Sequence, residues 1–237
     1  MQILVVVPTY NEATTIRAVV DAVTDLGFEI LVVDDGSPDG TADLVSAMAV
    51  RHGGIHLLRR TSKEGLGSAY RAGFDWALRA GRYDAVAQMD ADLSHDPLDL
   101  KRLVDTLVED GADLVIGSRY VAGGSTVGWA RRRQWLSRAG NHYMRLMTGI
   151  PLRDLTAGFR VWRTRTLADL ALTETVSEGY SFQLETVTRA AAAGTRVVEV
   201  PIVFTERAEG ESKMTGSIAF EALWRVALWG WRLRRSR

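Results

Sequence analysis

The sequence has 237 residues, of which 46% are hydrophobic and 24% charged, so it can form one full hydrophobic core with an ordinary surface. Basic and acidic residues balance at 29 each, so no overall positive field favours nucleic acid as a partner. The absence of cysteine excludes a disulfide framework, a thiolate nucleophile and a cysteine-based zinc site.

No stretch approaches the roughly 18 consecutive apolar residues of a membrane-spanning helix. The N-terminus has no basic region and leads directly into proline and polar residues, so we do not expect a signal peptide. We therefore expect a soluble or peripheral protein.

The first half of the chain alternates between two patterns. Short apolar, β-branched runs start about every 26 to 29 residues, near Ile3, Glu29, Ile55, Asp84 and Asp113. Helix-patterned segments lie between them, with expected starts at Asn11 or Thr14, Thr41, Leu66 and Pro97. This succession of βαβ units predicts an α/β protein with a mostly parallel sheet covered by helices on both faces.

After Ser118 the alternation breaks. The glycine-rich segment Val121–Gly128 is expected to be a mobile loop, and Arg131–Thr148 is a basic, amphipathic segment. Thr195–Phe204 reads as a further strand, in which Pro201 indicates an edge position or a bulge.

The C-terminal segment Ile218–Leu233 is tryptophan-rich and has the pattern of an amphipathic helix followed by arginines. We place one domain at residues 1–216 and this helix at 217–237. Tryptophan together with arginine suits a membrane interface. The alternative is a helix packed on the domain's own core.

Two aspartates separated by one alanine, Asp90 and Asp92, follow the apolar run Ala85–Met89. Two close carboxylates repel each other unless a positive group lies between them. Mg²⁺ takes one or two protein carboxylates together with substrate phosphates, so this pair is a candidate metal site. The alternative is that the pair caps a helix beginning at Pro97.

Two other strands are expected to end near this pair. The first ends in Pro8-Thr9-Tyr10-Asn11-Glu12, and the second in the turn from Asp34 to Thr41. Either loop alone fits a turn before a capped helix. Three loops that bring acids and an aromatic ring to the carboxyl edge of one parallel sheet favour a nucleotide site. The Gly-x-Gly of the loop Lys63–Gly67 is weaker evidence for the same site.

At this point the motifs match a known family. They are, in chain order, PTYNE, VVDDGSPDGT, MDADLSHDP, GSRY, DLTAGFR, EGYSFQLE, EVPIVF and the R-x-x-x-G-x-S-K pattern of Arg207–Lys213. The chain resembles the dolichyl (polyprenyl) phosphate mannose synthases of the inverting, GT-A-type glycosyltransferase family 2, from Ile3 to Lys213. The resemblance implies a GT-A, Rossmann-like fold.

The resemblance also implies roles for individual residues. The residues expected to line the guanosine pocket are Pro8, Tyr10, Glu12, Val33 and Asp35. Asp90, Ala91 and Asp92 are expected at the ribose, the diphosphate and an Mg²⁺ or Mn²⁺ ion, with Asp92 as the direct ligand. Ser94 occupies the position where some relatives carry a metal-binding glutamine, so Ser94 is expected as a metal ligand together with Asp90 and Asp92.

Arg119, Arg207 and Lys213 match the family's cationic contacts to donor and acceptor phosphates, and with Asp92 they are the expected catalytic residues. Arg119 could instead pair with an acid at a strand end, and Lys213 could be a solvated loop lysine. The residues Arg131–Arg133 are candidates for holding the acceptor phosphate, with a solvated basic face as the alternative.

The sequence leaves two alternative roles for each of two further acids. Asp154 and Glu178 could orient sugar hydroxyls, or pair with an arginine such as Arg160. His95 is expected to hydrogen-bond near the metal rather than to bind it.

The resemblance implies transfer of mannose from GDP-mannose to a polyprenyl phosphate, with inversion, on the cytoplasmic face of the membrane. One alternative keeps the fold and uses UDP-glucose. Another is a non-catalytic nucleotide-binding subunit that anchors a partner, which would need none of the acids and cations above. A nucleotidyltransferase is disfavoured, because its first strand should lead into a glycine-rich, basic loop rather than PTYNE.

Overall fold

The computed structural model describes residues 1–206, apart from the side chain of Tyr180. Arg207, Lys213 and the expected helix at 217–237 lie outside the described residues.

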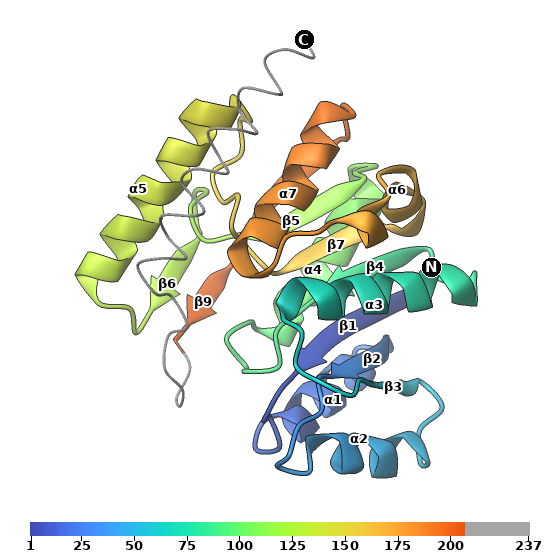
Figure 1. Ribbon diagram of the computed structural model, residues 1–237. Coiled ribbons are helices and arrows are strands. Elements are labelled where there is room, and N and C mark those ends of the chain that lie inside the picture. The colour runs from blue at the N-terminus through green and yellow to red at the C-terminus, as the bar shows by residue number, and fades with distance from the viewer. Residues whose placement is uncertain (207–237) are drawn as a thin grey trace.

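A seven-stranded sheet forms the centre of the molecule, in the order β3-β2-β1-β4-β7-β5-β8 (Figure 1). The strands are β1 (Ile3–Thr9), β2 (Glu29–Asp34), β3 (Ile55–Arg59), β4 (Ala85–Gln88), β5 (Leu114–Ser118), β7 (Arg160–Arg163) and β8 (Val197–Pro201). Only β7 runs antiparallel to its neighbours in this sheet. The predicted mostly parallel α/β sheet is therefore confirmed.

Helices cover both faces because successive strand residues point to opposite sides. Val5 and Val7 of β1 pack in the cluster that includes α1 (Ile16–Asp25), α2 (Thr41–Ala49) and α4 (Pro97–Glu109). Leu4 and Val6 pack in the opposite cluster. The helices contributing to that cluster are α3 (Leu66–Ala80), α5 (Arg131–Thr148), α6 (Thr164–Asp169) and α7 (Gly179–Ala192), together with the short 3₁₀ helix η1 (Leu172–Glu174).

The predicted starts of α2, α3 and α4 are confirmed at Thr41, Leu66 and Pro97. The first helix begins later than expected, at Ile16. Asn11 has a left-handed backbone with φ of 62°, which ends the strand in a turn and cannot begin a right-handed helix. The chain therefore forms a further turn before α1.

Two expectations for the second half need correction. Val121–Gly128 is not all loop, since β6 (Ser125–Val127) pairs in parallel with β9 (Val203–Thr205). The single strand expected at Thr195–Phe204 is divided between β8 and β9. Pro201 ends β8, which is the last strand at its edge of the large sheet, as the proline indicated. The short strand β7 was not predicted.

The helix α5 coincides with the basic segment recognised in the sequence. It lies beside the sheet, with β6 and β9 on the same side of the molecule (Figure 1). Among the described helices, none has the length and apolarity needed to cross a membrane.

Candidate active site

A cavity of about 460 Å³ opens where β1, β2, β4 and β5 end. This is the carboxyl edge, at which open parallel sheets bind ligands. Eight of the residues expected at the site line the cavity: Pro8, Tyr10, Glu12, Asp35, Asp90, Ala91, Asp92 and Arg119. The convergence of three separate strand ends, which the sequence predicted, is thus present in the structure.

Two expected site residues do not line the cavity. Val33 is fully buried in the hydrophobic core on the α3 face of the sheet. Ser94 is 2% exposed, and its backbone N–H donates to Asp92 Oδ1 at 3.0 Å. In this arrangement Ser94 holds an aspartate in place through its backbone.

The loop after β4 is strained at one residue. Leu93 has φ of 59°, an unfavourable conformation for a residue with a branched side chain. This turn brings the Ser94 N–H back to the carboxylate of Asp92, while the Ser94 carbonyl accepts from the N–H of Thr205 in β9. Such strain persists only where the surrounding contacts enforce it, and it concentrates at functional sites.

Asp90 borders a set of buried aromatic side chains. His95 is 4% exposed and stacks on Phe159 with ring centroids 4.6 Å apart. Its Nε2 lies 3.7 Å from Asp90 Oδ2, which is an electrostatic contact longer than a hydrogen bond. Burial and the negative charges of Asp90 and Asp92 raise the pKa of the Tyr70 phenol, so Tyr70 stays neutral beside the two carboxylates.

These two carboxylates are suited to a hard divalent cation. Both line the cavity, and the described part of the chain contains no cluster of three or more histidine, cysteine or acidic side chains that could enclose a metal by itself. Mg²⁺ and Mn²⁺ accept oxygen ligands, and Mg²⁺ usually keeps positions for water and substrate phosphates. The site therefore fits an ion shared between Asp90, Asp92 and a diphosphate.

The acids of the second strand end have different roles. Asp34 is buried and accepts hydrogen bonds from the hydroxyls of Thr9 and Ser37, so it shapes the loop. Asp35 lines the cavity and pairs with Arg60 at 2.9 Å. Burial raises the pKa of Asp35, and the charge of Arg60 opposes that rise.

One face of the Tyr10 ring already has a neighbour. The Lys63 ammonium lies 3.8 Å from the centre of this ring, at a cation–π distance. Lys63 also lines the cavity, and the sequence had indicated its loop only weakly.

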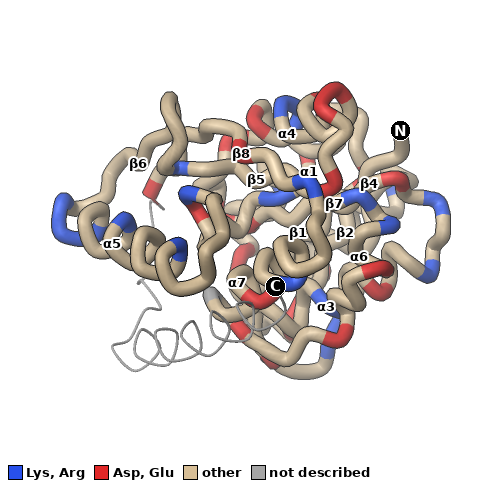
Figure 2. Tube along the Cα trace, turned by 90° about the horizontal axis from the view of Figure 1, so that it is seen from above, with Lys and Arg blue, Asp and Glu red and all other residues tan. Residues whose placement is uncertain are grey.

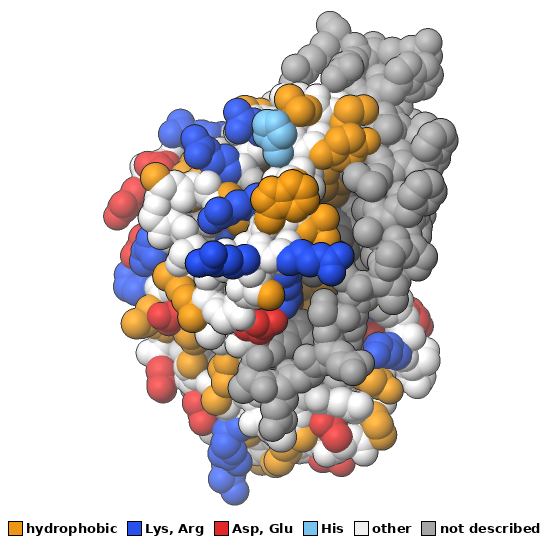
Figure 3. Space-filling view, turned by 90° about the vertical axis from the view of Figure 1, so that its left-hand side faces the viewer, with side chains coloured by type: hydrophobic (Ala, Val, Ile, Leu, Met, Phe, Trp, Pro, Cys, Tyr) orange, Lys and Arg blue, Asp and Glu red, His pale blue; other side chains and the backbone are white. Residues whose placement is uncertain are grey.

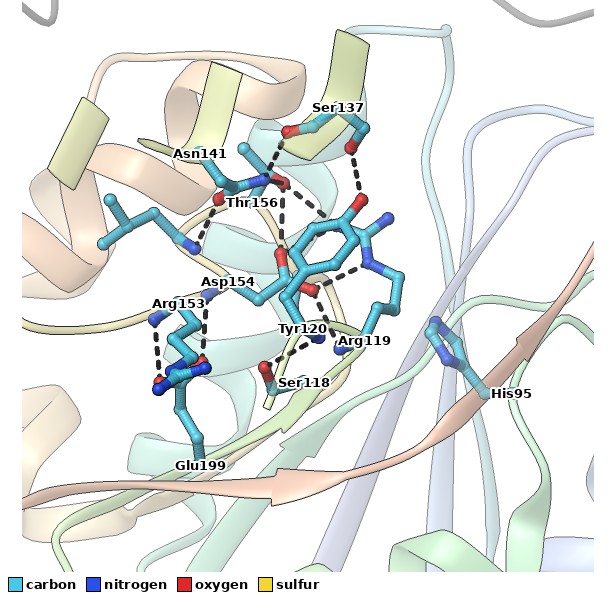
Figure 4. A network of polar contacts seen from close by, with 12 residues as sticks. His95, Ser118, Arg119, Tyr120, Ser137, Asn141, Arg153, Asp154, Thr156 and Glu199 are labelled. Atoms are coloured by element: carbon cyan, nitrogen blue, oxygen red, sulfur yellow. Dashed lines mark hydrogen bonds and ion pairs between the residues drawn. The ribbon is translucent and has the colours of Figure 1, made fainter. Parts of the chain in front are cut away.

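Arg119 forms a buried ion pair with Asp154 (Figure 4). Its Nε and Nη2 donate to the two carboxylate oxygens at 2.7 Å each, and Nη2 also donates to Thr156 Oγ1 at 3.0 Å. The acid is fixed in turn, since Glu199 accepts from the backbone N–H of Asp154. The alternative in which Asp154 pairs with an arginine is confirmed, with Arg119 rather than Arg160 as the partner, and Arg119 also lines the cavity.

Glu178 secures the start of α3. Its Oε2 accepts from the backbone N–H of Gly67 at 2.8 Å and of Ser68 at 3.2 Å, and its other oxygen pairs with Arg71. A β-carbon on Gly67 would lie 2.4 Å from the carbonyl oxygen of Ser177. The glycine is therefore required where the start of α3 packs closely against the segment before α7, which explains Gly67 without a phosphate ligand.

Several cavity residues were not among the expected site residues. Trp129, Gly158, Gln183 and Phe204 line the wall beyond Asp90. Among the three candidate acceptor arginines, Arg133 lines the cavity, whereas Arg131 and Arg132 are exposed. The sequence offered one indication of Gln183, its position in the motif EGYSFQLE within a segment that forms a helix.

Comparison with known proteins agrees with this geometry. Residues 4–170 match the model of glycosyl transferase family 2. The chain belongs to glycosyltransferase family 2. It is 49% identical over 237 residues to a polyprenol monophosphomannose synthase of Mycolicibacterium smegmatis, covering 99% of this chain and 89% of the relative. It is 47% identical to an undecaprenyl-phosphate mannosyltransferase of Micrococcus luteus, covering 97% of this chain and 94% of the relative.

Two solved structures share the fold. A mannosyltransferase of Pyrobaculum calidifontis in complex with GDP-Man and Mn²⁺ aligns with a TM-score of 0.59 at 23% identity, covering 89% of this chain and 58% of that chain. Staphylococcus aureus TarS aligns with a TM-score of 0.65 at 16% identity, covering 97% and 65%. The resemblance to family 2 mannose synthases and the GT-A fold are therefore confirmed.

The contacts of Glu178 predict a stability effect. Glu178→Gln removes the charge that caps α3 and pairs with Arg71, so the free energy of unfolding should fall by about 1 kcal/mol. Urea denaturation measures this change, with Glu174→Gln as the control at an exposed acid of η1. Unchanged stability in Glu178→Gln, together with weaker binding of the sugar nucleotide, would assign Glu178 to the substrate instead.

Proposed function

We propose that this family 2 enzyme transfers mannose from GDP-mannose to a polyprenyl phosphate, giving a β-linked lipid phosphate sugar. The observation that carries the proposal is one cavity lined by Asp90, Asp92, Tyr10 and Asp35, which combines a metal-binding pair with groups suited to a nucleoside. The names of the two relatives, at 49% and 47% identity, support mannose and a polyprenyl acceptor over the UDP-glucose alternative.

In the proposed reaction a phosphate oxygen of the acceptor attacks the anomeric carbon of mannose. The bond from that carbon to the diphosphate breaks, and GDP leaves with the electron pair, so the configuration inverts. A divalent cation, when bound, would neutralise the charge that develops on the departing GDP. Asp90 and Asp92 would hold that ion, and Asp35 and Glu12 would accept hydrogen bonds from the nucleoside.

The acceptor is already an anion, so the chain needs no strong general base and instead has to hold two anions within reach of each other. Arg133 is suited to this, since it lines the cavity and lies over the Trp129 ring at 4.0 Å. Arg119, oriented by Asp154, is a second cation of the same wall. By resemblance we also assign Arg207 and Lys213 to the phosphates.

The membrane interface is proposed to include α5 as well as the segment 217–237. The helix carries five arginines and no acid, and Figure 2 shows this run of basic positions. Trp135 is 70% exposed and Leu146 is 61% exposed. With His142 they share one helix face, and Figure 3 shows basic and apolar side chains interleaved there. We propose that the enzyme is peripheral to the membrane, and the resemblance implies its cytoplasmic face.

The reaction predicts a specific donor and acceptor. With Mg²⁺ and vesicles containing polyprenyl phosphate, label from GDP-mannose should enter a lipid that organic solvent extracts and mild acid cleaves. The same vesicles containing polyprenol, which lacks the phosphate, should accept none. Incorporation from UDP-glucose in place of GDP-mannose would contradict the donor assignment, and transfer to polyprenol would contradict the acceptor.

The helix α5 predicts a change in vesicle binding. Replacing Trp135 and Leu146 together by serine should weaken binding to vesicles with anionic lipid about tenfold, because two interfacial apolar side chains are lost. Vesicle co-sedimentation measures this, with Val50→Ser as a control for an exposed apolar residue at the end of α2. Equal binding of the double variant and the parent would exclude α5 from the interface.

A further inference from the structure

Gln183 of α7 has a buried amide without a partner. The residue is 2% exposed, and neither Oε1 nor Nε2 has a hydrogen-bond partner within residues 1–206. Buried amides in native proteins are nearly always hydrogen-bonded, because leaving one unpaired is costly. An unpaired amide that lines a cavity is therefore expected to find its partner in the ligand.

The amide shares one corner of the cavity with a metal-binding aspartate. A β-carbon built on Gly158 would lie 3.7 Å from Gln183 Nε2 and 3.9 Å from Asp90 Oδ2. Gly158 has no side chain, so this corner stays open to a ligand that reaches both groups.

The backbone of Gln183 is held by two hydrogen bonds on the side away from the cavity. The backbone carbonyl of Gln183 accepts hydrogen bonds from Arg160 Nη1 at 2.9 Å and from Thr186 Oγ1 at 3.0 Å. Arg160 is fully buried and also donates to the carbonyl of Ala157 at 2.8 Å, so it ties the loop before β7 to α7. Burial lowers the pKa of Arg160 to about 9, which leaves it charged at neutral pH. These contacts hold the backbone from which the amide of Gln183 extends.

The strand order tells which part of the donor reaches this corner. The candidate nucleoside residues end β1 and β2, and the metal-binding pair follows β4, the next strand across the sheet. A nucleoside diphosphate sugar is a linear molecule, so its sugar continues past β4 toward β7. Gly158 precedes β7, and Gln183 faces this part of the cavity.

We propose that the side-chain amide of Gln183 hydrogen-bonds hydroxyl groups of the donor sugar. Gln183 thereby favours binding of the nucleotide sugar over binding of the nucleotide alone. This inference rests on the proposed function and adds a residue that recognises the sugar. An amide supplies one acceptor and two donors, which matches the mixed donor and acceptor character of neighbouring sugar hydroxyls.

The test compares two ligands on one variant. Gln183→Met keeps the side-chain length without the amide, and calorimetry measures binding of GDP and GDP-mannose with Mg²⁺ present. The dissociation constant of GDP-mannose should rise on the order of tenfold, as for one or two lost hydrogen bonds, while that of GDP should change less than about twofold. If Gln183→Met does not fold, Gln183→Asn, which withdraws the amide by one methylene, should show the same selective loss.

The matched control is Gln88→Met, which alters another buried glutamine that does not line the cavity. Its affinity for both ligands should equal that of the parent. Unchanged GDP-mannose binding in the Gln183 variants, or an equal loss for GDP and GDP-mannose, would overturn the role of Gln183 and leave the proposed function intact. A parent protein that binds neither ligand would overturn both.

Discussion

The arrangement of the site depends on the repulsion between Asp90 and Asp92 at the end of a buried strand. Two carboxylates beside an apolar core are costly unless a cation or hydrogen-bond donors compensate their charge. Within residues 1–206, the N–H of Ser94 donates to Asp92 and His95 makes an electrostatic contact with Asp90, and both contribute to that compensation. We propose that a divalent ion bound with a diphosphate adds to it, so that the metal and the donor bind together.

Two buried arginines support the wall of the cavity, Arg119 as a lining residue and Arg160 from outside the cavity. Arg119 is fixed by Asp154, and Arg160 holds the loop before β7 against α7. Breaking such a buried pair by removing one partner typically costs 3–5 kcal/mol, as a scale for proteins generally. These contacts tie the segments that carry Asp154, Thr156 and Gln183 to the rest of the fold.

The parallel strands of the sheet, and the site residues at their ends, were predictable because their sequence signals are local. Parallel strands read as continuous apolar runs, and their ends placed Tyr10, Asp35 and Asp90 at one edge. The sequence did not indicate β7 because two of its four residues are arginines, and Arg160 is buried against partners in the distant helix α7. The pairing of β6 with β9, the contact of Lys63 with Tyr10 and the open amide of Gln183 depend on tertiary contacts, which one sequence does not show. The tail residues Arg207 and Lys213 stay predictions.

Titration with Mn²⁺, followed by electron paramagnetic resonance, tests most directly whether Asp90 and Asp92 bind the metal together with the nucleotide. The parent should bind one Mn²⁺ more tightly with GDP than without it. Asp90→Asn and Asp92→Asn should lose at least about tenfold in Mn²⁺ affinity, because a neutral amide is a weaker ligand for a hard cation. Asp96→Asn, at the N-cap of α4, should bind as the parent does. Undiminished Mn²⁺ binding in both the Asp90 and the Asp92 variant would contradict the account.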